Sequence, residues 1–558
     1  MLISLIHAFG IIGFTLSWLA YDHYRPWVNF HSEALAFGGL LLMVVSCVMK
    51  EKQRIAGPRL MVVILAVACI PWLQWMTGVN YFGGDALVAS LYVLGLAMAI
   101  YVGYSAKLNA PTSSNSGSAF LHVLWIAAMV SAVIGLMQWL SVQNILQMYA
   151  VQTDPGDRAM GNLGQPNQLA TLLLMGIASY ALAYEKGLFG KTAFGVGIAF
   201  LSVVLLLTES RTGLIGIVAM SALLAWKNWR NAGRLPVRAI VLWGLSCVSA
   251  RAMVPHIHEF LLLGTGRGMA LTEMDTRWLM WQQIAYGIQQ APWFGYGWNH
   301  TPSAHAAAAI AFPGSLTATN AHNVVLDLLA WNGIPVGLLL VGLCGYWFVS
   351  RLRRARQPDA IYALACLLPL GIHSLLEYPF AYSYFLVAGG LLVGWVEASI
   401  PRHIVVALNW RLSVGVLTLW AAAGIGIAYE YLPIEEDFRV VRFENLNIGT
   451  TPAGYDPPKI YVLSQMGAML RTSRMRPSPN MSKEALRELS EVANRFPYGA
   501  LALRNAIALG LNGNPAGASY QMAVIRGMYG EHFYAAAKHD LRLLQTEKYP
   551  ILKAVETP

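Results

Sequence analysis

Long apolar runs alternate with short polar connections along most of the chain. Thirteen of these runs approach the length of about 20 apolar residues that a helix needs to cross the hydrocarbon core of a bilayer. They lie at about 2–20, 32–49, 60–77, 85–104, 119–140, 168–184, 190–207, 212–226, 238–254, 333–350, 360–376, 381–398 and 412–430. The pattern therefore predicts an all-α polytopic membrane protein with about 13 transmembrane helices.

Composition supports the same class. The chain has 558 residues, of which 56% are hydrophobic and 12% are charged. Soluble globular domains carry about 25% charged residues, so this chain has too few charges to cover a soluble surface of ordinary composition.

Lysine and arginine are shared unevenly between the two sets of connections. The even-numbered connections hold 17 basic residues and the odd-numbered ones hold six. The six are Arg25, Arg158, Arg211, Arg251, Arg267 and Arg277. Because cytoplasmic loops carry the excess of Lys and Arg, we expect the N-terminus inside and the odd connections and the C-terminal segment outside. The net charge of +10 mostly records this bias and gives no support to a nucleic-acid partner.

The apolar density falls after about residue 430. Segments such as SKEALRELSEVANRF and YGALALRNAIALGLNG have the pattern of short amphipathic helices separated by Gly and Pro turns. Helix pairs of this length resemble a TPR-like array. We therefore predict a membrane domain over 1–430, with a large external loop at about 255–322, and an external helical domain over 431–558. The second domain is either a solvated cap or a docking surface for a protein or glycan.

Several motifs of nucleotide, metal and hydrolase chemistry are absent from the sequence. There is no Walker A loop, no HExxH, no CxxC pair and no GxSxG. An acidic pair of the DxD kind, which would hold a divalent cation on a nucleotide-sugar, is also missing. We therefore expect no cofactor and no metal.

Polar residues gather instead at the outer ends of apolar runs. GNLGQPNQLA brings Asn162, Gln165 and Asn167 to the start of a helix, where backbone N–H groups suit a phosphate or a sugar. Its glycines and proline also suit a plain turn. Arg211 follows a tight turn between two runs. It can clamp an anion through two hydrogen bonds, or simply extend to the membrane interface.

Two further clusters complete this set. HSLLEYPFAYSY places His373, Glu377 and Tyr378 at the outer end of a run. A glutamate close to hydrocarbon is costly and usually functional, whereas Tyr378 also suits an interfacial aromatic belt. In NAHNVVLD, His322 precedes Asn323 at the start of an apolar run. Helix capping by an asparagine beside a solvated histidine is the simpler explanation there. Four clusters on one face favour an outward-facing site for a charged, lipid-tethered substrate.

These motifs resemble those of bacterial protein O-oligosaccharyltransferases of the PglL type, which share a membrane superfamily with O-antigen ligases and polymerases. The resemblance rests on GNLGQPNQLA, on AHN at the end of the long external loop and on HSLLEYP. It covers nearly the whole chain, including the helical C-terminal segment. G-N-x-G-Q-P-N is the more specific signal for the protein-glycosylating branch. That branch often has a histidine where Gln168 stands here.

The resemblance implies transfer of a glycan en bloc from a polyprenyl (undecaprenyl) pyrophosphate to Ser or Thr hydroxyls of periplasmic proteins such as pilin. It implies a bacterial inner-membrane enzyme that works without a metal. His322 and Tyr378 match the functional histidine and tyrosine of the family, and Arg211 matches the essential arginine of the ligases. These three are the catalytic candidates, with His322 acting as a base or positioning the pyrophosphate.

The remaining candidates would bind substrate. They are Gln165, Asn167, Asn162, Arg277, Asn323, Glu377 and His373. An O-antigen ligase or polymerase that uses the same donor is the first alternative function. A lipid or solute transporter without enzymatic activity is the second, although transporters more often show inverted repeats and charges at the middle of the membrane.

Overall fold

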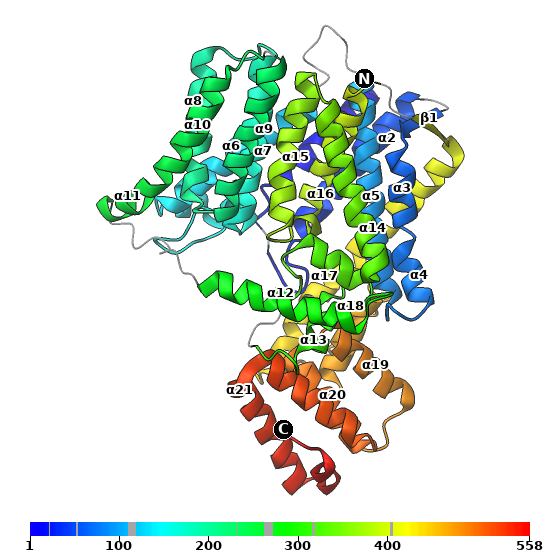
Figure 1. The fold of residues 1–558 in the computed structure, drawn as a ribbon. Coiled ribbons are helices and arrows are strands. Elements are labelled where there is room, and N and C mark those ends of the chain that lie inside the picture. The colour runs from blue at the N-terminus through cyan, green and yellow to red at the C-terminus, as the bar shows by residue number, and fades with distance from the viewer. Residues whose placement is uncertain are drawn as a thin grey trace. The chain divides into compact units, whose positions relative to one another are not determined.

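The structure is a computed structural model that describes residues 1–21, 23–51, 54–109, 119–231, 233–261, 272–314, 318–401 and 405–557. Arg267, one of the six outward basic residues, lies outside these ranges. The described part is predominantly helical (Figure 1), which confirms the predicted class. The two strands within it, β1 (Arg54–Pro58) and β2 (Val405–Asn409), form a small antiparallel sheet.

Six helices within the described ranges are long and apolar enough to cross a membrane. They are α2 (Phe30–Glu51), α5 (Gly83–Leu108), Leu121–Trp139 of α6 (Ala119–Trp139), Val237–Phe260 with α10 (Val237–Ala250) and α11 (Val254–Phe260), α14 (Val324–Arg354) and α17 (Trp410–Asn445). Shorter apolar helices include α1 (Leu2–Leu16), α3 (Leu60–Val67) with α4 (Ile70–Met76), α8 (Lys191–Leu207) and α16 (Ser383–Ser399). A multi-pass membrane protein is thereby confirmed, and the count of thirteen spans stays a prediction.

The chain divides into two compact units, each of which is described by itself. Unit 1 comprises Met1–Val67, Tyr92–Ala270 and Cys344–Ala421. Unit 2 comprises Ala68–Leu91, Leu271–Leu343 and Ala422–Pro558. The predicted boundary at residue 430 stays a prediction.

Unit 1 is built around α7 (Pro166–Glu185), which is buried at every residue from Gln168 to Tyr184. It packs against α6, α8, α9 (Arg211–Asn231) and α15 (Pro358–Ser374). Small residues allow this close packing: a Cβ atom added at Gly176 would overlap the methyl group of Ala128 on α6. Small residues at contacts between membrane helices let backbones approach and gain van der Waals energy. The start of α7 is thereby fixed relative to the ends of its neighbours.

Unit 2 contains most of the long external connection. The segment predicted as a loop at 255–322 includes α11 in unit 1 and α12 (Thr272–Gln290) and α13 (Thr301–Ala308) in unit 2. These last two helices pack against each other. The connection is therefore largely helical in its described part, and the start of α14 follows directly after it.

α14 bends sharply ten residues into its length. Gly333 has a left-handed φ of 75°, and Pro335 follows two residues later without a backbone N–H to continue the ladder. A Cβ atom added at Gly333 would overlap the backbone of Trp293. Both the turn and the close approach therefore require glycine at this position.

The C-terminal part of unit 2 is a series of helices: α18 (Ser464–Arg474), α19 (Lys483–Arg495), α20 (Gly499–Leu511) and α21 (Pro515–Glu547), followed by the short 3-10 helix η6 (Pro550–Ala554). α20, α21 and η6 enclose a small apolar core that includes Leu511, Met522, Ile525, Leu541 and Leu552. Its TPR-like character stays a prediction.

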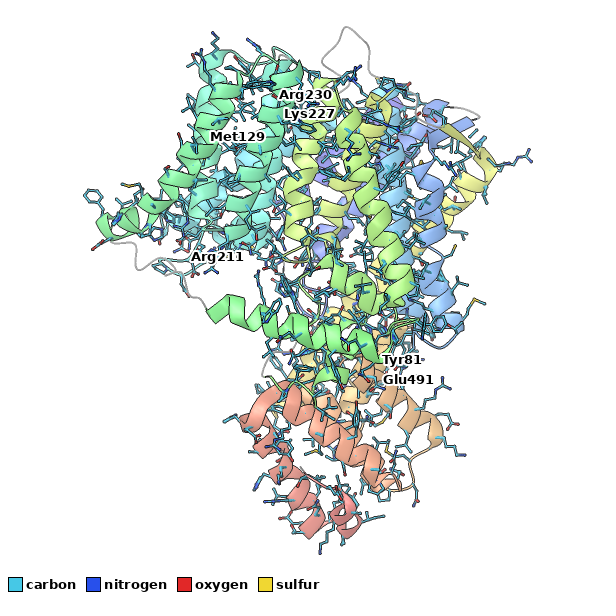
Figure 2. All side chains as sticks on the ribbon, viewed as in Figure 1. Tyr81, Met129, Arg211, Lys227, Arg230 and Glu491 are labelled. Atoms are coloured by element: carbon cyan, nitrogen blue, oxygen red, sulfur yellow. The ribbon has the colours of Figure 1, made fainter. Side chains whose placement is uncertain are left out.

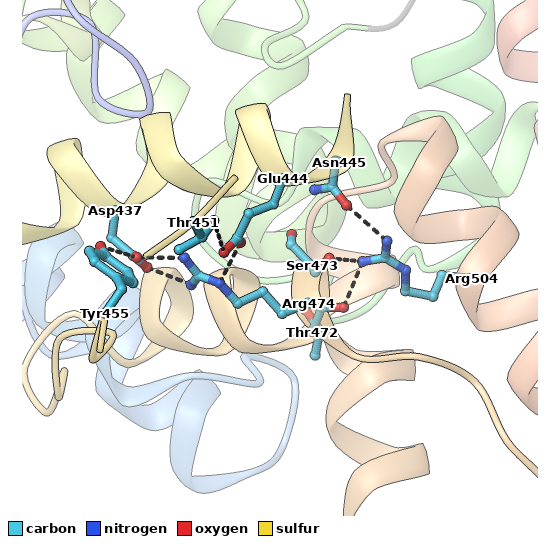
Figure 3. A network of polar contacts seen from close by, with 9 residues as sticks. All are labelled: Asp437, Glu444, Asn445, Thr451, Tyr455, Thr472, Ser473, Arg474 and Arg504. Atoms are coloured by element: carbon cyan, nitrogen blue, oxygen red, sulfur yellow. Dashed lines mark hydrogen bonds and ion pairs between the residues drawn. The ribbon is translucent and has the colours of Figure 1, made fainter. Parts of the chain in front are cut away.

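A charged network ties the end of α17 to α18 (Figure 3). Arg474 donates to both carboxylate oxygens of Asp437, at 2.6 and 2.8 Å, and to Glu444 at 2.7 Å. The hydroxyl of Tyr455 donates to Asp437 at 2.7 Å. Asp437 is buried, so its charge is stabilised by the fork of the guanidinium group. The network fixes the first helix of the C-terminal series to the polar end of α17.

Candidate active site

The GNLGQPNQLA motif forms a fixed turn at the start of α7. Gly161 and Gly164 have left-handed φ values of 59° and 69°, which glycine adopts without steric cost. Asn162 is buried, and its amide N–H₂ donates to the carbonyl groups of Leu19 at 2.8 Å and Tyr149 at 2.9 Å. The amide of Asn162 therefore holds neighbouring backbone in place.

Asn167, in the first turn of α7, connects three elements of unit 1. Its Oδ1 accepts a hydrogen bond from the Ser210 hydroxyl at 2.7 Å, and its N–H₂ donates to Oε1 of Glu377 at 3.3 Å. Arg158 approaches the same Oδ1 at 3.5 Å. Ser210 also caps α9, because its Oγ accepts from the N–H of Gly213 at 2.9 Å. A single amide thus links the start of α7, the start of α9 and the segment after α15.

The buried side of α7 contacts His373 through Thr171 and contacts Tyr384 through Gln168. The Nδ1 atom of His373 lies 2.8 Å from the hydroxyl of Thr171, and both residues are buried. Gln168, which stands where the protein-glycosylating branch often has a histidine, accepts a hydrogen bond from the Tyr384 hydroxyl at 2.7 Å. The glutamine therefore has a partner that its amide oxygen satisfies.

Tyr378 lies at the end of a stack of three tyrosine rings. Its ring centroid lies 5.8 Å from that of Tyr382 at an interplanar angle of 19°, and Tyr382 stacks on Tyr384 at 5.5 Å. Burial raises the pKa of the Tyr378 hydroxyl above its usual value near 10. The hydroxyl therefore keeps its proton at neutral pH and can donate a hydrogen bond.

Arg211 is the first residue of α9 and is exposed (Figure 2). The preceding turn is held by Glu209, which is buried, has a left-handed φ of 48° and pairs with Arg251 at 3.0 Å. Non-glycine residues in this conformation cost about 1–3 kcal/mol and persist where the surroundings fix them. Arg158 donates from Nε to the carbonyl of Thr208 at 2.7 Å in the same turn.

This end of unit 1 has the features of an anion site. The N-termini of α7 and α9 meet through Asn167 and Ser210, and each carries about half a positive charge. Arg158 contacts Asn167 and the turn before α9, and Arg211 is the first residue of α9. Backbone N–H groups and guanidinium groups are the donors that phosphate oxygens prefer.

His322 lies at the start of α14 in unit 2 and has a left-handed φ of 51°. The backbone on both sides is fixed by carboxylate and amide groups. Oδ1 of Asp327 accepts from the N–H of Ala321 at 2.9 Å, and Oδ1 of Asn323 accepts from the N–H of Val325 at 2.9 Å. Asn323 is therefore a helix cap, as the simpler explanation proposed. His322 is partly exposed, and its backbone conformation costs about 1–3 kcal/mol.

α12 and α13 support the same segment. The indole of Trp281 on α12 donates to the carbonyl of Ala321 at 2.9 Å, and Thr301 on α13 donates to Asp327 at 2.6 Å. Arg277 precedes Trp281 by one helical turn and therefore lies on the same face of α12. The structure thus brings His322, Asn323 and Arg277 to one region of unit 2.

Unit 1 similarly gathers most of its own candidates. Asn167, Glu377 and His373 are joined through contacts at the start of α7, Tyr378 follows Glu377 directly, and Gln165 is the extended N-cap residue of α7. Sequence reasoning missed Ser210 and Thr171, because small hydroxyl residues carry no signal until their partners are known. Within the described ranges, no group of three or more His, Cys, Asp or Glu residues is placed to hold a metal ion.

Three family models match successive parts of the chain. Residues 159–182 match a protein glycosylation ligase model, residues 196–341 match an O-antigen ligase model, and residues 361–543 match the C-terminal model of a virulence factor membrane-bound polymerase. The first range contains GNLGQPNQLA, the second contains Arg211 and His322, and the third contains Tyr378.

Two relatives from Acinetobacter baylyi are similar over most of their length. A general O-oligosaccharyltransferase is 27% identical over 514 residues, which are 88% of each chain. A ComP-specific O-oligosaccharyltransferase is 25% identical over 397 residues, which are 70% of each chain.

The fold and these matches together define a membrane-bound glycosyltransferase. The resemblance to the PglL-type protein O-oligosaccharyltransferases, within the superfamily of O-antigen ligases, is confirmed.

Proposed function

We propose that the protein transfers a glycan en bloc from a polyprenyl (undecaprenyl) pyrophosphate to Ser or Thr hydroxyls of periplasmic proteins, such as pilin. The chain would sit in the bacterial inner membrane with about thirteen spans and with its site and TPR-like C-terminal helices on the periplasmic side. The observation that carries this proposal is the meeting of two helix N-termini and two arginines at one end of unit 1, a setting for a pyrophosphate.

The leaving group is stabilised by this positive end of unit 1. As the bond between the anomeric carbon and the phosphate oxygen breaks, its electron pair passes to the pyrophosphate. Arg211, with the N–H groups at the starts of α7 and α9, neutralises the charge that develops there. Gln165 and Asn167 contact the donor, and Glu377 and His373 hold Asn167 and α7 in position. Asn162 acts by shaping the turn.

The acceptor hydroxyl attacks the same anomeric carbon and loses its proton. His322 takes this proton as a general base, or it positions the pyrophosphate, because an imidazole can accept a proton or donate a hydrogen bond and this one is presented by a fixed backbone. Tyr378 donates a hydrogen bond to donor or acceptor. Arg277 and Asn323 bind substrate.

The acceptor is the point on which the alternatives differ. The match of residues 196–341 to an O-antigen ligase model keeps a ligase or polymerase with the same donor as the second candidate. The match of residues 159–182 to a protein glycosylation ligase model and the two O-oligosaccharyltransferase relatives favour a protein acceptor. A lipid or solute transporter has no comparable support.

The test uses the full chain in proteoliposomes with a purified lipid-linked oligosaccharide. One reaction contains a pilin as acceptor and the other contains lipid A core. We expect glycan on the pilin, measured by intact-protein mass spectrometry, and none with His322→Ala. Transfer to lipid A core alone would establish the ligase, and movement of the donor between leaflets without any transfer would establish a transporter.

A further inference from the structure

A cavity of about 440 Å³ lies in unit 2 and contains none of the candidate active-site residues. Its walls come from the end of α4, the turn between α4 and α5, and α19, and include Trp75, Met76, Asn80, Tyr81, Arg487 and Glu491. Figure 2 labels Tyr81 and Glu491 in this region. The volume falls within the range of about 300–1,000 Å³ that is typical of small-molecule sites.

Asn80 is the strongest indication of a ligand. The residue is 1% exposed, and neither its amide oxygen nor its amide nitrogen has a hydrogen-bond partner among the residues that the structure describes. Buried amides are almost always paired, because an unpaired one loses its bonds to water without compensation. The amide offers one acceptor and one donor side by side, which matches two adjacent hydroxyl groups.

The other walls suit a neutral polyhydroxylated ring. Trp75 is 43% exposed, so aromatic surface is available beside the cavity. Nε of Arg487 pairs with Oε1 of Glu491 at 2.7 Å, so donors and an acceptor lie together on α19. An apolar peptide side chain would leave Asn80 unpaired, and the Arg487–Glu491 pair has no net charge to hold a phosphate. A pyranose places C–H groups on an aromatic face and hydroxyl groups on amides and charged groups.

The turn that carries Asn80 lies in unit 2, as His322 does, and hydrogen bonds within that unit hold it in place. The N–H₂ of Gln74 donates to the carbonyl of Trp331 at 2.9 Å, and its Oε1 accepts from the N–H of Trp298 at 2.9 Å. The N–H of Asn80 donates to the carbonyl of Gln74 at 3.0 Å. Trp331 lies on α14, whose first turn follows His322. The cavity is therefore preformed, as a binding site should be.

We propose that this cavity binds one sugar residue of the glycan, other than the residue whose anomeric carbon reacts. The inference rests on the proposed function. Because that sugar is unchanged by the reaction, the cavity holds it equally in the ground state and the transition state. Such uniform binding lowers KM for the donor and leaves kcat unchanged.

The test compares two donors with the full chain in proteoliposomes: a polyprenyl pyrophosphate carrying a trisaccharide and one carrying a single sugar. Asn80→Leu removes the donor and acceptor and keeps the branched shape of the side chain. We expect its KM for the trisaccharide donor to rise about 10-fold, the loss of one or two hydrogen bonds, with kcat unchanged. Its KM for the single-sugar donor should stay at the wild-type value. Its melting temperature should stay the same or rise, because an unpaired buried amide is gone.

Trp75→Ala should give the same pattern through loss of the aromatic face. Trp293→Ala is the matched control, because Trp293 is an exposed tryptophan of the same unit that is not among the residues lining the cavity. Equal losses with both donors would show a merely structural role. A rise in KM for the protein acceptor alone would show a polypeptide site. Either result would overturn the proposal.

A binding arm separates this proposal from the proposed function. Labelled full-length protein in detergent is applied to an array of printed di- and trisaccharides. Binding by the wild type that is lost in Asn80→Leu and kept in Trp293→Ala upholds the sugar subsite even if no transfer is observed. Failure of the wild type to bind any printed glycan, together with unchanged KM values in the variants, would refute it.

Discussion

The two clusters of candidate residues are held in place in different ways. At the start of α7 in unit 1, side chains hold one another: Asn167 bonds to Ser210 and Glu377, and Thr171 contacts His373. At the start of α14 in unit 2, side chains hold the backbone. Asp327 and Asn323 accept from N–H groups on either side of His322.

The difference teaches what each cluster is built to do. A network of side chains fixes where charged and polar groups point, which suits the binding of an anion of defined shape. A clamped backbone fixes one strained residue and leaves it partly exposed, which suits a group that must meet a substrate and exchange a proton.

The largest effects should follow from removing the group that each cluster presents. We expect Arg211→Ala to lower transfer about 10²–10³-fold by loss of a positioned charge, and His322→Ala to lower it about 10²–10⁴-fold by loss of a base. The measurement is initial rate of pilin glycosylation at matched membrane abundance. His532→Ala, at an exposed histidine of unit 2, serves as the control and should retain wild-type activity. A His322→Ala enzyme of normal rate would reduce that segment to a helix cap.

Acid should destabilise unit 2 through His305 on α13. Burial lowers the pKa of this histidine from about 6.5 to about 4, and its ring is fully enclosed beside Gln283. The unfolded chain therefore binds a proton that the folded chain rejects between these values, so stability falls as pH drops from 6.5 towards 4. The full loss is on the order of 3 kcal/mol.

Thermal unfolding in detergent at several pH values measures this slope. His305→Gln, which cannot titrate, should flatten the dependence between pH 4 and 6.5. A slope that is identical in the variant would assign the acid sensitivity to other groups, of which His300 is the first candidate because burial also lowers its pKa.

Breaking the backbone clamp should cost less than removing His322. Asp327→Leu leaves the N–H of Ala321 without its acceptor, which costs about 1–3 kcal/mol of stability. We expect kcat to fall with little change in donor KM, since His322 is displaced and the anion site is intact. Asp327→Asn keeps an acceptor oxygen and should restore most of the rate. If both variants lose activity equally, the charge of Asp327 matters beyond its role as an acceptor.

The smallest effect should come from the shared hydroxyl in unit 1. Ser210→Ala removes the cap of α9 and one bond to Asn167, at a cost of about 1 kcal/mol. Donor KM should rise several-fold while kcat is nearly kept, in contrast to Asp327→Leu. Steady-state kinetics with a varied donor measure the difference. The same KM and kcat pattern in both variants would remove the distinction between the two clusters.

Sequence patterns located the starts of the important helices better than their contacts. GNLGQPNQLA predicted a helix start, and α7 begins at Pro166 inside the motif, because proline and the glycines fix the turn locally. The contact between Thr171 and His373 joins residues 202 positions apart and depends on how α7 and α15 pack. A local pattern holds no information about such a pair.

Two further differences have the same origin. The apolar run predicted from 333 is part of a helix that begins at Val324, since the polar residues before Gly333 are satisfied by tertiary partners such as Thr301. His305, in the segment predicted as a loop, is buried in α13 against Gln283. A polar residue near an apolar run does not reveal whether its partner is solvent or protein.

The kink in α14 also limits which substitutions this helix can tolerate. Gly333 is confined twice, by a positive φ and by the backbone of Trp293, so any other residue would be disfavoured in the folded chain for two separate reasons. On the same helix, Gly342 and Gly345 have no atoms within 4 Å of an added Cβ. A saturation library selected for activity should therefore keep glycine alone at 333 and accept many residues at 342 and 345. One helix thus contains an invariant glycine and two replaceable ones.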